Sequence, residues 1–189
     1  MHPLPEFDFA GPTTRQRVAE HNKAVAGLDA DQADVERLAG QLANLDPLTV
    51  DPEAAEQLAR TVAHRRHGSI KAAVALYQFR LPILSALEED RQRAEQEARE
   101  ALTQRRAETA EGLKAAGYGH LLASDNPVVR RQVVELVDAS APVIAAANRF
   151  AELRQQRTTL NEVRMTAHRE IAELTAKLRS ALRETAAAI

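Results

Sequence analysis

The chain of 189 residues contains no cysteine and no tryptophan, and aromatic residues make up only 3% of it. Without cysteine the chain can form no disulfide framework, no thiolate zinc site and no cysteine nucleophile. The alternating pattern typical of strands is also missing. The abundance of alanine, leucine, glutamate and arginine instead predicts an all-α protein with a thin core of small residues.

Neither sign of charge is in large excess, because 25 basic residues are balanced by 27 acidic residues and the net charge is -2. Such a balance gives no overall attraction to nucleic acid or to an anionic membrane. At the N-terminus no basic segment precedes an apolar run, and we find no apolar window that approaches the length needed to cross a bilayer. We therefore expect a soluble, cytoplasmic protein without a membrane span.

A long seam of apolar residues runs through the last quarter of the chain. From Ala146 to Ala188, positions spaced alternately by four and three residues are apolar except at Arg157, Arg164 and Thr185. This spacing follows about 3.5 residues per turn and predicts a helix whose seam faces a partner helix. Because neither glycine nor proline follows Pro142, we expect one long helix from there to the end of the chain.

The first part of the chain divides into an arm and a helix. Residues 1–12 are rich in proline and predict an extended arm that packs loosely on its own body, with a short partner-binding motif as the alternative. Thr13 and Gln16 match a capping box, so a helix should begin there. Its apolar residues stay in phase across Gly27, which favours a single helix over 14–45.

Two interpretations are open for the next helix, which Asp51 and Pro52 should start. In-phase apolar residues favour one helix from 52 to about 116 with a kink near Pro82. The alternative is a set of shorter helices broken at Gly68 or at Pro82, and the pair Gly68 and Ser69 favours such a break. A turn should follow at 117–126, and a valine-rich helix over 128–139 should then continue or kink into the last helix.

Antiparallel pairing of these helices gives the expected architecture. If the second turn is centred near residue 122, the numbers of facing residues add to about 244. In that register Arg157 and Arg164 fall near the acids at 88–90, which predicts that they fix the pairing of the helices. We expect an antiparallel long-helix bundle of about three to five helices with a coiled-coil-like helical hairpin stalk. The predicted parts are an arm at 1–12 and a single all-α domain at 13–189, with a bundle body at 13–87 and 165–189 and a hairpin at 88–164 whose tip is 117–126.

The valine-rich helix predicts self-association. Its apolar residues lie on more than one face, whereas its expected neighbour at 94–117 offers few large apolar side chains. A second copy of the chain would cover the excess and give a homodimer. The residues assigned to this contact are Val128, Val129, Val133, Val134, Val137 and Ile144.

A local run of basic residues has two interpretations. No acid occurs between Glu56 and Glu88. One interpretation is pairing with the acids at 29–36 of the first helix, which should lie opposite. The alternative is an anion or nucleic-acid site in the stretch 60–80, formed by Arg60, His64, Arg65, Arg66, His67 and Lys71.

Other chemistry has little support in the residues. His64 and His67 are spaced to chelate a metal with His168 or His21 as a third ligand, but no HExxH pattern accompanies them. We therefore predict no metal, no cofactor and no catalytic residue. Tyr118, between two glycines, should pack in the turn or contact a partner at the tip. The sequence thus predicts a non-enzymatic helical scaffold or protein-protein interaction module that binds itself and an unknown protein partner.

Overall fold

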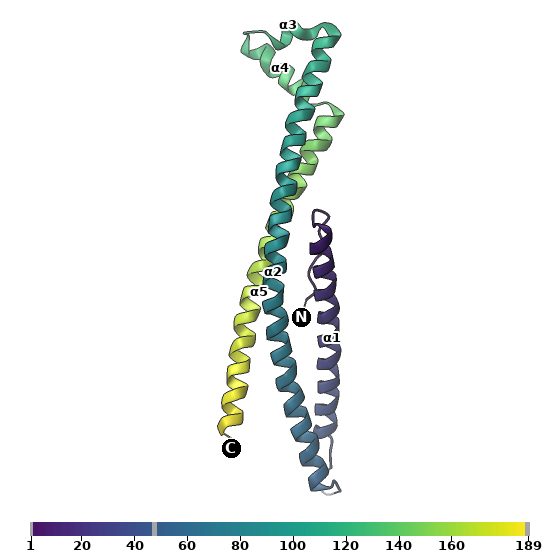
Figure 1. Cartoon of the computed structure of the whole chain (residues 1–189), viewed down its shortest axis with the longest axis vertical. Coiled ribbons are helices and arrows are strands. Elements are labelled where there is room, and N and C mark those ends of the chain that lie inside the picture. Colours follow the sequence, from purple (N-terminus) through teal and green to yellow (C-terminus); the bar gives the residue numbers. More distant parts are fainter. Residues whose placement is uncertain (1, 47–48, 188–189) are drawn as a thin grey trace. The chain divides into compact units, whose positions relative to one another are not determined.

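The computed structural model describes residues 2–46 and 49–187, with side chains as far as Ser180. Every regular element in this part of the chain is helical, and no strand occurs in it (Figure 1). The predicted all-α class is therefore confirmed. The chain divides into two units: unit 1 comprises Met1–Leu87 and Asn161–Ile189, and unit 2 comprises Glu88–Leu160. Each unit is described separately below.

Helix α1 (Pro12–Ala43) runs without a break through Gly27, as the phase of its apolar residues predicted. Its N-cap is Gly11, and no side chain caps it. The predicted capping box is wrong, because Pro12 occupies the first turn, where its fixed φ suits a helix, so that Thr13 already lies inside the helix. The side-chain amide of Gln16 donates to the carboxylate of Glu20 at 2.8 Å rather than back to the backbone at the N-cap.

Helix α2 (Pro52–Leu113) is continuous through Gly68 and Pro82, which settles the choice between the two interpretations. At its start the backbone amide of Glu53 donates to Oδ1 of Asp51 at 3.2 Å, so the predicted start is confirmed. The phase of the apolar side chains outweighs the local break signals here, because burial of that face stabilises the helix more than one glycine or proline destabilises it.

One expectation about α2 was wrong. The helical stretch Pro52–Leu122 contains a window long and apolar enough to cross a membrane by length and composition, although only 33% of that window is buried. The core helix of a protein that never enters a membrane passes the same test. The length of apolar windows therefore no longer argues against a membrane span, and this window does not by itself indicate one.

The connection between the long helices follows the predicted turn signals. After α2 come a π-helical segment, η1 (Lys114–Tyr118), and a short helix, α3 (Gly119–Leu122). Gly117 has a φ of 92°, a conformation that side chains other than glycine rarely adopt. Asn126 then caps α4 (Pro127–Asp138), and its side chain accepts from the amide of Val128 at 2.9 Å.

The last helix, α5 (Ala141–Ala187), is separated from α4 by Ala139 and Ser140. The chain therefore breaks just before Pro142 rather than at it. As expected, no further break occurs in α5 up to its described end.

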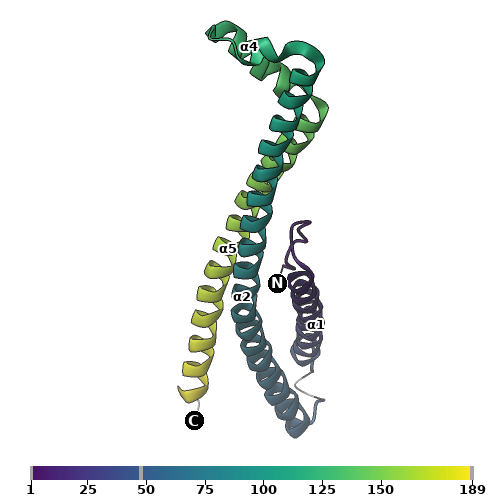
Figure 2. The same cartoon turned by 45° about the horizontal axis from the view of Figure 1, so that its top comes forward.

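In unit 1, three helical segments share a core. The side chains of Leu28 on α1, Ala73 on α2 and Leu174 on α5 line one cavity of about 220 Å³. Figures 1 and 2 show α1 lying beside the first part of α2. The buried apolar side chains of the three segments are Val18, Val25, Leu28, Val35, Val62, Ala73, Tyr77, Ile83, Leu84, Leu87 and Ala167.

The N-terminal arm packs tightly on unit 1, and the expectation of loose packing was wrong. Asn22 of α1 binds both backbone groups of Leu4: its Oδ1 accepts from the amide at 2.7 Å, and its Nδ2 donates to the carbonyl at 2.9 Å. Phe7 and Phe9 stack with ring centroids 4.8 Å apart. Leu4, Phe7, Phe9 and Ala10 are all buried, so apolar side chains anchor the arm.

In unit 2, the second part of α2 runs antiparallel to α4 and the first part of α5. Nε of Arg106 donates to Oδ1 of Asp138 at 2.8 Å, and these residue numbers add to the predicted 244. Arg157 lowers the pKa of Glu88 through its charge, after the larger effect of the hydrogen bonds from Arg91. This effect agrees with the predicted position of Arg157 near Glu88, whereas the position of Arg164 near these acids stays a prediction.

Candidate interaction sites

The tip of unit 2, residues 113–144, collects exposed apolar side chains. Of the seven large apolar side chains that are exposed in the described part of the chain, five lie here. Their exposed fractions range from 45% to 61%. Single exposed apolar residues need no explanation, but such a cluster is typical of an interaction surface. The five are Tyr118, Val128, Val134, Leu136 and Ile144.

A small apolar cavity of about 300 Å³ opens in the same tip. Gly117 creates the bend that places Tyr118 over the residues that follow it. Tyr118 lines the cavity and still keeps 52% of its surface exposed, so turn packing and availability to a partner both apply to it. The other lining residues are Leu113, Leu121, Leu122, Val133 and Leu136.

The residues predicted for self-association do not share one environment. Val128, Val134 and Ile144 are exposed, Val129 and Val133 are half-buried, and Val137 is buried. The difference follows from helix geometry: Val133 and Val137 are four residues apart and point the same way, whereas Val128 and Val134 point elsewhere. An interface at the tip would therefore use the exposed three, of which Val128 and Val134 lie on α4 and Ile144 lies on α5.

The basic stretch of α2 meets the acids of α1 across unit 1. Arg65 pairs with Asp34 at 2.5 Å, and Arg60 pairs with Glu56 on its own helix at 2.6 Å. Hydrogen bonds from Arg37, together with the charge of Arg65, lower the pKa of Asp34. The interpretation of cross-helix pairing is thus confirmed for Arg65.

The other basic residues of the stretch are spread around α2. His64 lines a cavity of about 410 Å³ with Asp31, and Arg66 lines another of about 350 Å³ with Glu36. His67 is half-buried and Lys71 is exposed. Because acids of α1 border both cavities, the surface is mixed in charge rather than basic. The anion site stays a prediction that these contacts do not favour.

The four histidines considered as metal ligands are not brought together. No group of three or more potential ligands occurs among the described residues. His64 and His168 are exposed, whereas His21 is fully buried.

A polar cluster lies in the core of unit 1, and none of the predicted sites brought its residues together. His21 comes from α1, Tyr77 and Arg80 from α2, and Glu170 from α5. The Tyr77 hydroxyl donates to the Glu170 carboxylate, and Cζ of Arg80 lies 5.6 Å from the centroid of the Tyr77 ring. His21, Tyr77 and Arg80 are exposed by 0%, 3% and 4%. One feature of the sequence could have indicated that His21 is buried: it lies in phase with Val18, Val25 and Leu28 on the buried face of α1.

Burial controls the protonation of this cluster. Burial lowers the pKa of the His21 imidazole; the hydrogen bond with Asn22 opposes this, and the charge of Arg80 adds to it. Burial and the neighbouring Glu170 carboxylate raise the pKa of Tyr77, and burial lowers that of Arg80. Nε2 of His21 and Nε of Arg80 have no hydrogen-bond partner in the described part of the chain. The cluster therefore holds a neutral imidazole beside a guanidinium.

The pH dependence of stability should report this imidazole. Because the folded pKa of His21 lies below the unfolded value near 6.5, the unfolded state binds more protons as pH falls below about 7. We expect the free energy of unfolding, measured by urea titration, to fall from pH 7.5 to pH 5. The variant His21→Leu should flatten this slope, and the exposed control His168→Leu should keep it. An equal slope in all three proteins would contradict this role of His21.

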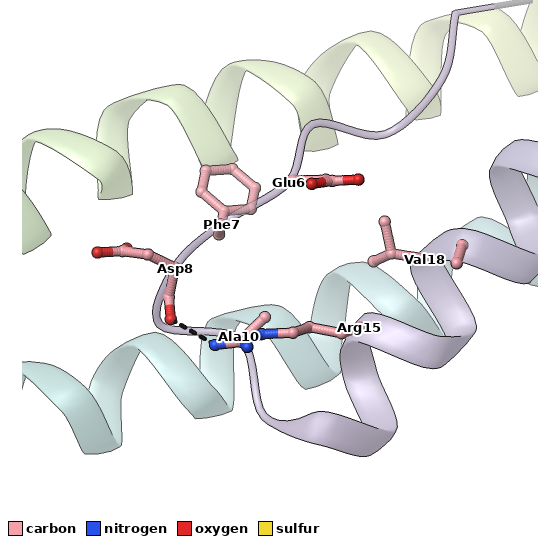
Figure 3. Close-up of a pocket in the computed structure, with 7 residues that line it drawn as sticks. Glu6, Phe7, Asp8, Ala10, Arg15 and Val18 are labelled. Carbon is pink, nitrogen blue, oxygen red and sulfur yellow. Dashed lines mark hydrogen bonds between the residues drawn. The ribbon is translucent and has the colours of Figure 1, made fainter.

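The arm and α1 enclose a cavity of about 630 Å³ (Figure 3). Phe7 and Ala10 line it from the arm and Val18 from α1, so much of its wall is apolar. The Arg15 guanidinium donates to the carbonyl of Asp8 at 2.8 Å and ties the arm to the first turns of α1. Glu6, Asp8 and Arg15 also line the cavity, so its wall is mixed in polarity, and its side chains form no nucleophilic arrangement.

Besides Tyr118, one further aromatic side chain of the described residues is exposed: Phe79 on α2 keeps 48% of its surface. Phe79 lies outside the buried face of α2. The sequence pattern alone did not distinguish it from the buried apolar residues around it.

Comparison of the chain with protein-family models, curated proteins and solved structures gives no match.

Proposed function

We propose that this chain is a non-enzymatic helical interaction module that self-associates through the tip of unit 2. The concentration of exposed apolar side chains at residues 118–144 carries the proposal. Water contact with this cluster is unfavourable by roughly 25 cal/mol per Å² of apolar surface, so burial against another surface is the outcome that stabilises it. The cavity at the tip is lined by Tyr118 and aliphatic side chains, which supports binding rather than catalysis.

The charges of α4 support a second copy of the chain as the occupant. Arg130 and Arg131 lie near the start of this helix, and Glu135 and Asp138 lie near its end. The side chains of Arg131 and Glu135 are 83% and 63% exposed, although they form a pair within the helix at 3.0 Å. If two copies of α4 pack antiparallel, the basic end of each lies beside the acidic end of the other. Complementary charges and exposed valines thus occur on the same short helix.

Light scattering coupled to size-exclusion chromatography tests the proposal. We expect the mass of the parent in solution to be at least twice the 20.7 kDa of one chain. The double variant Val128→Asp with Val134→Asp should show a smaller multiple, because two carboxylates would be placed in an apolar contact. Both side chains are exposed in the folded chain, so the substitutions should leave its circular dichroism unchanged.

Met165→Asp is the matched control, because Met165 is 70% exposed but lies in unit 1. This variant should keep the mass of the parent. A monomeric parent, or an equal loss of mass in the control, would overturn the proposal.

A further inference from the structure

A second apolar seam runs along the outer side of α2 in unit 1. Its positions are spaced alternately by four and three residues, as in helices that pack on a partner. None of them is charged, and Phe79, the largest, is 48% exposed. Five are exposed and Ala86 is half-buried, so α1 and α5 leave most of the seam open, although Gly68 and Ala72 border a cavity that Asp31 of α1 also lines. The seam consists of Gly68, Ala72, Ala75, Phe79, Pro82 and Ala86.

We propose that this seam binds the same seam of a second copy of the chain, with the two α2 helices antiparallel. The positions are symmetric about residue 77, so a twofold axis there pairs every member with another member. Each large side chain then meets a small one. Phe79 faces Ala75 of the second copy, Pro82 faces Ala72, and Ala86 faces Gly68. This alternation of large and small residues lets two helices approach closely and fill the space between them.

Charge selects both the occupant and the direction. The next seam positions along α2 are Arg65 at one end and Glu89 at the other, and both are exposed. In the antiparallel pair, Arg65 of each copy faces Glu89 of the other, which gives two ion pairs. A parallel pair would place Arg65 against Arg65. The Arg65 side chain keeps 52% of its surface exposed beside Asp34, so it has room for a second carboxylate.

The flanking residues raise no conflict. On one side of the seam lie Lys71, Gln78 and Ser85, all exposed. Position 78 lies one residue from the axis in each copy, so the two Gln78 side chains are offset by about 3 Å along the helices and their amides can bond to each other; Lys71 lies beside Ser85 with the same offset. No like charges meet along this flank. The arrangement also gives a reason for the absence of acids between Glu56 and Glu88, because the basic stretch faces the acids that follow it in the other copy.

This surface is distinct from the tip of unit 2, and the inference therefore goes beyond the proposed function. Each proposed contact joins a surface to the same surface of a second copy. A chain that carries two such surfaces can link to a different copy at each, and the assembly then grows beyond a dimer.

Site-specific crosslinking tests the inference, because the parent chain has no cysteine. In the variant Gln78→Cys the two thiols should lie next to each other across the axis, and a short bis-maleimide should join them into a covalent dimer. Gln57→Cys is the matched control, since Gln57 is also an exposed glutamine of α2. At 1.5 Å per residue the two control thiols would lie about 60 Å apart and should not be joined. Equal crosslinking of both variants, or none at position 78, would overturn the inference.

Charge reversal tests the direction of pairing. In the Gln78→Cys background, Arg65→Glu should abolish the crosslink, and Glu89→Arg added to it should restore the crosslink. A loss that the second reversal does not restore, in a variant with unchanged circular dichroism, would contradict the antiparallel pairing. The change of Val128 and Val134 to aspartate should leave the crosslink intact. The two proposals can therefore fail independently.

Discussion

Replacing Glu170 with alanine should lower the free energy of unfolding by about 3 kcal/mol, because a buried charge and a buried hydroxyl would both lose a stabilising partner. Arg80 is 4% exposed, and burial lowers its pKa while the charge of Glu170 opposes that effect. Without Glu170 the guanidinium would remain buried with no compensating acid, and the Tyr77 hydroxyl would lose its acceptor. Urea unfolding followed by circular dichroism measures the loss.

A double-mutant cycle separates this explanation from a simple loss of packing. If the buried charge causes the loss, Arg80→Met should cost less than Glu170→Ala, and the two changes together should be more stable than Glu170→Ala alone. Glu173→Ala, one turn further along the same helix at an exposed position, should change stability by less than about 0.5 kcal/mol. Additive effects of the two changes would show that Arg80 and Glu170 do not stabilise each other.

The helices and their pairing could be predicted because each depends on a pattern repeated many times. The apolar phase of α2 continues through Gly68 and Pro82, and the helix follows it. The sum of 244 for facing residues is matched by Arg106 with Asp138 and nearly matched by Tyr77 with Glu170. A turn of known position and the constant rise of a helix suffice to fix such a register.

The details at helix ends and in the arm could not be predicted in the same way. At the start of α1, Pro12 and Thr13 are both suitable for a first turn, and a difference of one or two residues decides which cap forms. The tight packing of the arm depends on Leu4 reaching Asn22, a contact between residues 18 apart that no repeated pattern signals.

The polar cluster and the tip show a second limit of the sequence. A polar residue on an apolar face can be buried or can mark the edge of that face, and the pattern does not distinguish the two. Arg91 illustrates this: it is 2% exposed because Glu88 and Glu95, one turn away on either side, both accept from its guanidinium. In α4 the sequence showed apolar residues on more than one face but not which of them the rest of unit 2 covers: Val137 is buried, whereas Val128 and Val134 are exposed.

Replacing Leu84 with alanine should destabilise unit 1 by about 2 to 5 kcal/mol, because the lost contacts and the remaining cavity both contribute. Leu84 is 2% exposed and is flanked on α2 by the buried Ile83 and Leu87. Because a core of small residues contains few large side chains, each of them contributes a large share of the buried apolar surface. The loss should therefore fall in the upper half of that range. Met165→Ala, at a side chain that is 70% exposed, should change stability by less than about 0.5 kcal/mol. Equal losses for both variants would mean that α2 is not packed at Leu84 as described, and the outward position of Phe79 five residues earlier would then lose its support as well.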